Sequence, residues 1–206
     1  MRPTKAQMAA LKRRDPVLGA RIKHLPSFPN FPVGVLRGPY FHVLARSIVY
    51  QQLATRAAAT IYGRVRKLGP GSRFPTPAQM LALSDEELRG AGLSGNKAKA
   101  LRDLASKIVS GELRLKGIAR HEDEEVIRRL CTVWGIGEWT AQMFLIFKLG
   151  RLDIMPSGDL GVQNGLRILD GLDGRPSPDT LLLRAEVWRP LRSVAAWYLW
   201  RLTNTG

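Results

Sequence analysis

Hydrophobic periodicity is the feature of this chain that most limits what it can fold into. Along almost all of its 206 residues, apolar side chains recur at helical spacing, and no stretch alternates apolar and polar side chains for long enough to make a strand. Helical spacing puts apolar side chains on one face of each helix, where they can be buried together. The sequence therefore predicts an all-α fold.

The expected helices leave one irregular region near the start of the chain. Residues 1–36 are expected to form a helical and irregular segment, with polar helices up to residue 24 and a proline-rich connector after it. This segment should pack on a core formed by residues 37–206. Within the core, helices are expected at residues 40–52, 54–68, 96–109, 124–132 and 138–149, with a turn-rich break over 69–77 and a short helix after the capping pair Ser84 and Glu87.

The charge of the chain restricts its partners. The chain has 32 Lys and Arg and 17 Asp and Glu, which gives a formal net charge of +15. Such a field attracts polyanions, although a solvated basic surface or an anionic membrane would fit the same charge. No apolar run reaches the length of a membrane span and the first residues carry no apolar signal core. We expect a cytoplasmic protein without membrane contact, at the nucleoid in a bacterium or in the nucleus of a eukaryote.

Cysteine and histidine usage excludes several cofactors. Cys131 is the only cysteine, so the chain can form neither an internal disulfide nor a four-cysteine iron–sulfur cluster. The histidines, His24, His42 and His121, lack the spacing of metal ligands, so no zinc is expected. The sequence predicts that no cofactor is required.

A glycine-rich turn joins the helices expected at 124–132 and 138–149. It reads Val133-Trp134-Gly135-Ile136-Gly137. Glycine can take positive φ, and amides at the start of the following helix can then point at a phosphate oxygen, while Ile136 is expected to turn into the core. An ordinary turn between two helices, with glycine after the first, fits the two glycines as well.

The neighbours of the turn favour the first interpretation. Leu130 and the pair Thr140-Ala141 complete the pattern Leu-x-x-x-x-Gly-Ile-Gly-x-x-Thr-Ala, which resembles the helix-hairpin-helix of base-excision DNA glycosylases. The later segment Pro156-Ser157-Gly158-Asp159-Leu160-Gly161-Val162-Gln163 resembles the one that carries the catalytic aspartate there. The run from Val187 to Trp200 is similar to the 3-methyladenine DNA glycosylase II family. The resemblance covers about residues 40–202 and implies a short form without the N-terminal β domain of the long members.

The resemblance implies a fold, a partner and a reaction. The fold would be a two-lobed helical bundle with an active-site cleft between the lobes, acting as a monomer on double-stranded DNA that contains damaged bases. The reaction would be hydrolysis of the N-glycosidic bond of alkylated bases such as 3-methyladenine and 7-methylguanine, after the base is flipped out of the helix. Trp139 stands where bifunctional relatives carry a lysine nucleophile. Tryptophan cannot form an imine, so the product would be an abasic site in an uncut strand.

Asp159 is the expected catalytic residue. Breaking the glycosidic bond builds positive charge on the sugar, which a fixed carboxylate stabilises, and the same carboxylate can orient or deprotonate water. Capping the helix that follows is the ordinary role of an aspartate at such a place, and Asp159 can do both.

Trp139, Met143 and Trp200 match the pocket that would hold the flipped base. Aromatic faces suit electron-poor, cationic alkylated purines. Core packing explains Trp200 equally well. Met143 replaces a tyrosine of the long members, which leaves the base preference open.

Further residues are assigned to DNA contact. Gln52 or Leu53 would fill the gap left by the flipped nucleotide, although glutamines at a helix end can simply face solvent. The hairpin contact is expected from Gly135, Ile136, Gly137 and Thr140, and the backbone carbonyls of Cys131, Val133 and Ile136 match a site for a Na⁺ or K⁺ ion. The basic side chains that could contact phosphate are Lys97, Lys99, Arg189 and Arg192.

Two other functions remain open. A non-catalytic helix-hairpin-helix protein would bind DNA without excising a base, and Asp159 with the tryptophan pocket weighs against it. A glycosylase of the same fold could act on oxidised or mismatched bases instead, and Met143 and Gln52 leave room for that reading.

Overall fold

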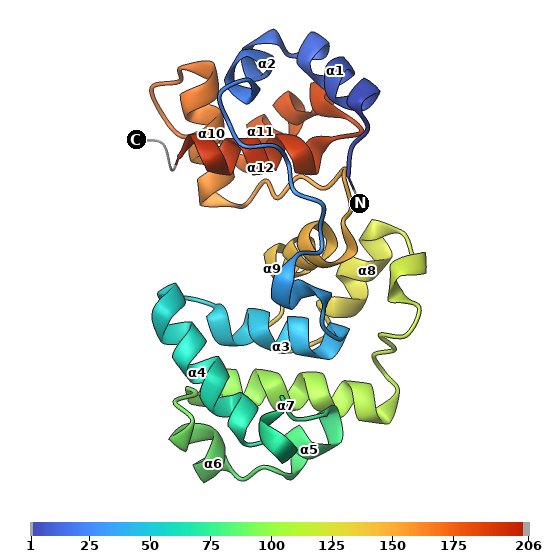
Figure 1. Cartoon of the computed structure of the whole chain (residues 1–206), viewed down its shortest axis with the longest axis vertical. Helices are drawn as coiled ribbons and strands as arrows, with labels where there is room; N and C mark the ends of the chain where they lie inside the picture. The colour runs from blue at the N-terminus through green and yellow to red at the C-terminus, as the bar shows by residue number, and fades with distance from the viewer. Residues whose placement is uncertain (1, 204–206) are drawn as a thin grey trace. The chain divides into compact units, whose positions relative to one another are not determined.

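A computed structural model describes residues 2–203, apart from the side chain of Val35, and shows helices and no strand in this range (Figure 1). The chain divides into two compact units. Unit 1 combines the segment up to Gly34 with the segment from Leu145 onward, and unit 2 is Val35–Phe144. The helices of unit 1 are α1 (Lys5–Arg14), α2 (Pro16–Ile22), α10 (Leu160–Asp170), α11 (Pro178–Ala185) and α12 (Arg192–Leu202). Those of unit 2 are α3 (Tyr40–Tyr50), α4 (Thr55–Lys67), α5 (Pro77–Ala82), α6 (Asp85–Gly90), α7 (Gly95–Ser110), α8 (Asp123–Leu130) and α9 (Glu138–Met143).

The central contact of unit 1 is the packing of α10 against α12, which lie side by side in Figure 1. A Cβ at Gly165 would lie 2.3 Å from the carbonyl oxygen of Leu199. No side chain fits at that distance, so the glycine is what lets the two backbones approach. All residues of α12 from Val194 to Leu199 are buried.

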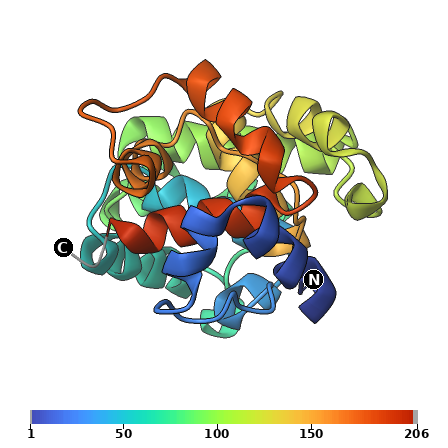
Figure 2. The same cartoon turned by 90° about the horizontal axis from the view of Figure 1, so that it is seen from above.

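In unit 1, α1 contacts the short 3-10 turn Glu186–Trp188 and α2 contacts α10, while the connector that follows α2 reaches α12; Figure 2 shows the same helices from above. Phe28 makes an edge-to-face contact with Trp197, with ring centroids 5.8 Å apart. Between α1 and α2, the buried Asp15 accepts hydrogen bonds from Leu18 N at 2.9 Å, from Trp188 Nε1 at 2.7 Å and from Arg184 Nη2 at 2.6 Å. One carboxylate therefore ties the start of α2 to the segment that precedes α12.

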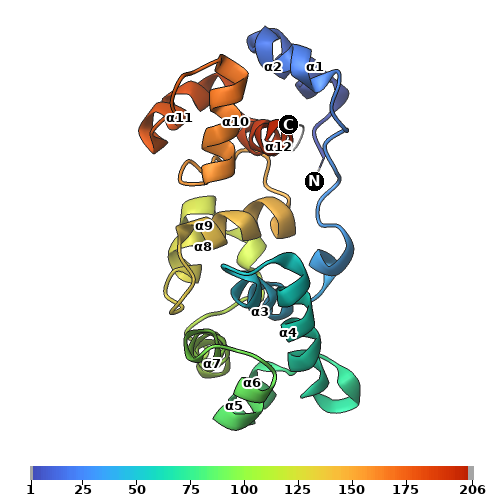
Figure 3. The same ribbon diagram turned by 90° about the vertical axis from the view of Figure 1, so that its left-hand side faces the viewer.

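In unit 2, α7 is the element around which the others gather, with α3, α5 and α6 packed on it (Figure 3). Leu101 and Leu104 of α7 are fully buried, as are Ile48 of α3 and Met80 of α5. Ser84 and Glu87 form the expected capping box at the start of α6, with hydrogen bonds in both directions.

Most expected helices are present within a few residues of their predicted bounds. α5, α11 and α12 lie outside the predictions. The helix expected at 138–149 is wrong in one respect: it is α-helical only to Met143 and continues as a wider π-helical turn over Phe144–Leu149. None of the helices within residues 2–203 combines the length and apolar character needed to cross a bilayer. The cleft expected between two lobes stays a prediction.

Candidate active site

Asp159 begins α10, and its carboxylate is held by two donors. Oδ1 accepts a hydrogen bond from Val162 N at 2.9 Å, which caps the helix, and another from Trp200 Nε1 at 2.8 Å. Asp159 and Trp200 are both partly exposed. The structure therefore brings together two of the residues singled out in the sequence, and the indole fixes the direction in which the carboxylate faces.

Gly161 makes room for this pair. A Cβ at this position would lie 2.9 Å from Cδ1 of Trp200 and 3.1 Å from Oδ1 of Asp159. Gly161 lies one helical turn before Gly165 on α10. The close packing of α10 on α12 is therefore also what brings the indole to the carboxylate.

The loop before Asp159 is fixed from inside unit 1. Asp159 N donates to Pro156 O at 3.0 Å and closes a tight turn. The buried Gln163 reaches back from α10, and its Nε2 donates to Ser157 O at 2.7 Å. Because the turn is bonded to the helix it precedes, the carboxylate has little freedom to move away.

Further upstream, Ser193 at the start of α12 holds the chain at Leu152 and Ile154. Ser193 N donates to Leu152 O at 2.9 Å, and its side-chain oxygen accepts from Ile154 N at 2.8 Å. Ser193 itself is fully buried. The segment that leads to Asp159 is thus attached to the helix that supplies Trp200.

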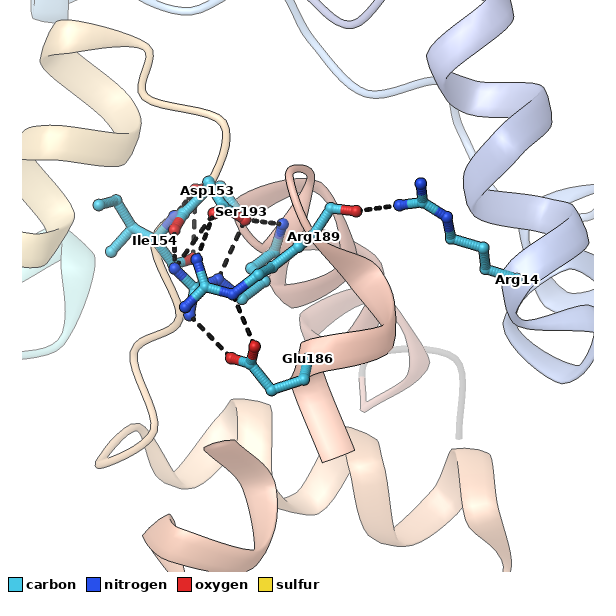
Figure 4. Close-up of polar contacts among 7 residues, drawn as sticks. Arg14, Asp153, Ile154, Glu186, Arg189 and Ser193 are labelled. Carbon is cyan, nitrogen blue, oxygen red and sulfur yellow. Dashed lines mark hydrogen bonds and ion pairs between the residues drawn. The ribbon is translucent and has the colours of Figure 1, made fainter. Parts of the chain in front are cut away.

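Charged side chains reinforce the same attachment (Figure 4). Arg192 donates through Nε to Asp153 Oδ1 at 3.0 Å, and Arg189 lies 3.1 Å from Asp153 Oδ2. Arg189 also pairs with Glu186 at 2.7 Å, and its carbonyl accepts a hydrogen bond from Arg14. Arg189 and Arg192 were expected as phosphate contacts. Carboxylates accept hydrogen bonds from both side chains, which therefore help to hold this segment, and a phosphate contact by either arginine stays a prediction.

The two glycines of the hairpin differ in backbone conformation, because one has positive φ and the other negative φ. Gly135 has φ of +82°, whereas Gly137 has φ of −96° and ψ of 176°, which any residue can adopt. Of the two glycines that could take positive φ, only Gly135 does so. Ile136 is 4% exposed and packs in the core, as expected.

Helix α7 supports the hairpin. Trp134 N donates to Asp103 Oδ2 at 2.7 Å, and a Cβ at Gly135 would lie 3.0 Å from Cβ of Ala100. Lys99 Nζ lies 4.5 Å from the centre of the Trp134 ring. Lys99 is exposed, so a phosphate contact by this residue stays a prediction.

Trp139 and Met143 line a pocket of about 420 Å³ in unit 2. The pocket is also lined by Arg46, Tyr50 and Gln52, and the guanidinium of Arg46 lies 3.7 Å from the centre of the Tyr50 ring. Trp139 is 47% exposed, which is unusual for tryptophan in a core. Trp200, the third expected pocket residue, belongs to unit 1.

The loop between α3 and α4 presents the two residues expected to enter DNA. Gln52 and Leu53 are exposed, and Gln52 has φ of +54°, which is uncommon for a residue other than glycine. Lys97 was expected at phosphate, but its Nζ donates to the carbonyls of Val49 and Gln51 at 2.6 and 2.8 Å. Its charge is therefore used to hold this loop.

Metal ligands do not gather in the part of the chain that the structure describes: no three His, Cys, Asp or Glu side chains there lie close enough to share an ion. The carbonyls proposed for a monovalent cation are those of Cys131, Val133 and Ile136, in the hairpin. Val133 O accepts a hydrogen bond from Ile136 N at 3.0 Å. A carbonyl oxygen has a second lone pair, so this use is compatible with an ion.

This geometry has a counterpart among known proteins. The family model for HhH-GPD superfamily base excision DNA repair proteins matches residues 45–190. The chain belongs to this superfamily. Its match includes α3 to α11, and so contains the hairpin, the α3–α4 loop and Asp159 of this HhH-GPD chain.

Individual relatives agree with the family. DNA-3-methyladenine glycosylase 1 of Schizosaccharomyces pombe is 38% identical over 165 residues, which are 80% of this HhH-GPD chain and 72% of the relative. The structure of the 3-methyladenine DNA glycosylase of that yeast in complex with abasic DNA superposes with a TM-score of 0.87, at 32% identity, over 98% of both chains. A DNA-3-methyladenine glycosidase from Bacillus halodurans gives a TM-score of 0.86 at 34% identity, over 100% of this chain and 92% of that one.

Several residues that build the site were not among those predicted. A glycine inside a helix is a sequence signal for close backbone approach, and Gly161 and Gly165 both give it. Gln51, Asp103 and Arg46 carry no such signal, because their partners lie far away in the sequence.

Proposed function

We propose that this HhH-GPD chain is a monofunctional DNA glycosylase that releases alkylated bases, of the 3-methyladenine and 7-methylguanine type, from duplex DNA. The observation that carries the proposal is the Asp159 carboxylate, which Trp200 and the start of α10 hold in a fixed direction. It is supported by relatives whose names state removal of 3-methyladenine. Capping α10 requires only the bond from Val162, so the additional bond from Trp200 is what favours a catalytic role over DNA binding alone.

The proposed chemistry needs only this carboxylate and water. As the bond from C1′ of the deoxyribose to the base nitrogen breaks, its electron pair leaves with the base, which is neutral once released because the alkylated base was cationic. The sugar gains positive charge, and Asp159 stabilises it. Water then attacks C1′ and gives its proton to the carboxylate, which leaves a hydroxyl on C1′ and an abasic site.

Other residues of the proposed site bind and position. Trp139 and Met143 would stack on the flipped base, and Gln52 or Leu53 would fill the gap left in the duplex. The hairpin from Gly135 to Thr140 would hold a phosphate, and a Na⁺ or K⁺ ion at its carbonyls would strengthen that contact. Neither the ion nor any other cofactor supplies a chemical step.

The proposal also includes the absence of lyase activity and a monomeric state. With Trp139 in place of the lysine nucleophile, the enzyme would not cut the strand. We propose that it acts as a monomer on damaged double-stranded DNA, in the cytoplasm of a bacterium or the nucleus of a eukaryote. Met143 and Gln52, which both line the pocket of unit 2, keep activity on oxidised or mismatched bases as the second candidate.

The test uses Asp159→Asn on duplexes that each carry one defined lesion, with release scored as strand breaks after alkali. Asparagine can still accept the hydrogen bond from Val162, so the variant should fold and bind DNA as the wild type does. Excision should fall by about 100-fold or more, because a preorganised charge opposite a developing cation is a large catalytic term. Asp173→Asn is the matched control, since it removes the same charge from an exposed position of unit 1.

The same reactions distinguish the alternatives. Wild-type product should stay uncut until alkali is added, and borohydride should trap no protein on the DNA. A trapped adduct would show that an amine of the chain acts as nucleophile. Release of 8-oxoguanine or a mismatched base, but not of 7-methylguanine, would favour the second candidate, and normal excision by Asp159→Asn would refute the assignment of the catalytic residue.

A further inference from the structure

Gln51 connects two parts of unit 2 that lie far apart in the sequence. From the end of α3, its Nε2 donates to Gly135 O at 3.0 Å and to Thr140 Oγ1 at 3.3 Å. Gly135 is in the turn of the hairpin and Thr140 is on α9, where it is 4% exposed. One amide group therefore contacts both sides of the hairpin, and it does so from the residue directly before Gln52.

The backbone of the same loop is held by α7. Lys97 donates to the carbonyl of Gln51 at 2.8 Å and to that of Val49 at 2.6 Å. These carbonyls belong to the last turn of α3, whose oxygens have no partner within the helix. The backbone of Gln51 is thus fixed to α7 while its side chain is fixed to the hairpin.

Gln52 directly follows Gln51 but differs from it in exposure and in backbone conformation. It is exposed, and its left-handed φ of +54° turns the chain abruptly. A strained backbone of this kind persists only where surrounding contacts enforce it, and it occurs mostly at functional sites. The contacts that enforce it here are those of Gln51 and Lys97.

We propose that Gln51 is a positioning residue that fixes the α3–α4 loop in register with the hairpin, with Lys97 holding the loop backbone. The inference rests on the proposed function. A side chain that enters the duplex must do so at a fixed distance from the phosphate that the hairpin holds. Stacked base pairs are about 3.4 Å apart, so a loop that drifted by a fraction of this step would meet the wrong pair.

The test separates binding from flipping. Gln51→Met keeps the length of the side chain and removes its donor. The probe is a duplex with one tetrahydrofuran abasic-site analogue next to 2-aminopurine, whose fluorescence rises when its stacking is disturbed, and the reference is the same duplex without the analogue. Affinity for the reference duplex should stay within about twofold. Preference for the analogue should fall roughly three- to tenfold, the effect of one or two hydrogen bonds, and the fluorescence rise should shrink with it.

Lysine variants give a second, independent readout. Lys97→Met should reproduce the loss of preference, whereas Lys97→Arg should retain it because a guanidinium can still donate to both carbonyls. Adding Lys97→Met to Gln51→Met should cause less than the sum of the two losses, since both residues hold one loop. Lys116→Met is the matched control, because Lys116 is exposed and its loss removes the same charge.

The outcomes are distinguishable. Folded Gln51→Met protein with wild-type preference and fluorescence would overturn the inference, as would equal losses in Lys97→Met and Lys97→Arg. If Gln51→Met does not fold, the two lysine variants decide. If the wild type itself shows neither preference nor a fluorescence change, the base-flipping function fails and not only the role of Gln51.

Discussion

At the scale of single residues, the site depends on side-chain contacts that neither composition nor a motif can predict. The capping role of Asp159 follows from its place before a helix, and the sequence predicts it correctly. Trp200 was expected either in the base pocket or in the core, and neither expectation included its hydrogen bond to the Asp159 carboxylate. Lys97 was expected at phosphate as one of several basic side chains, but the acceptors that the structure gives it lie 46 and 48 residues away in the sequence.

The two hairpin glycines should respond differently to alanine. Gly135→Ala forces a left-handed φ on a residue with a Cβ and presses it against Ala100, so it should reduce the free energy of unfolding by about 1–2 kcal/mol. Gly137→Ala introduces no strain, since its φ is ordinary and nothing lies within 4 Å of the added Cβ. Its stability should match that of the wild type.

Denaturant unfolding and salt titrations of binding to intact duplex measure both effects. Weaker binding by Gly137→Ala, with a shallower dependence on salt, would place this glycine at the DNA, because each phosphate contact contributes a slope of about −0.9 in log–log form. Unchanged affinity and slope would mean that the methyl group added at Gly137 does not touch the DNA.

At the scale of elements, helix periodicity finds long amphipathic helices and loses short ones. α5 has only 6 residues, too few for the apolar repeat to be recognised, whereas α11 has 8, as many as the predicted α8. The apolar pattern of α11 is blurred by Leu183, which is 78% exposed. A capping signal was available for α5, where Thr76 and Gln79 form a capping box around Pro77.

The junction of α1 and α2 should make stability depend on pH through Asp15. Burial alone would raise the pKa of Asp15, but hydrogen bonds from Leu18, Trp188 and Arg184 outweigh it and hold the pKa below its ordinary value. A depressed pKa in the folded state stabilises the protein above the unfolded value of about 3.9 and loses that effect as the pH falls below it. Asp15→Asn should therefore lower the free energy of unfolding by about 2 kcal/mol at neutral pH, the size of a charged hydrogen bond.

The difference between wild type and Asp15→Asn should be constant above about pH 5 and shrink as acid is added. Urea unfolding at a series of pH values measures it, with the exposed Asp173→Asn as control. A difference that persists unchanged at pH 3 would show that Asp15 contributes packing and not charge.

At the scale of the whole molecule, the sequence predicts the all-α class and the superfamily, because three separated motifs occur in the right order. The division of the chain into two compact units could not be predicted from the sequence. Nothing in residues 1–36 indicates that they share a unit with residues more than a hundred positions later, since the evidence is the contact of single side chains such as Asp15 with Trp188.

That division bears on how the protein is made. Unit 2 is continuous, so every residue it needs has left the ribosome once Phe144 has emerged. Unit 1 cannot close then, because α1 and α2 must wait for Arg184 and Trp188, and Asp159 must wait for Trp200. α1 and α2 are synthesised before their partners in unit 1, so their apolar residues stay open to chaperones until the later segment of that unit has emerged. The Asp159 carboxylate is therefore oriented only after Trp200 has emerged.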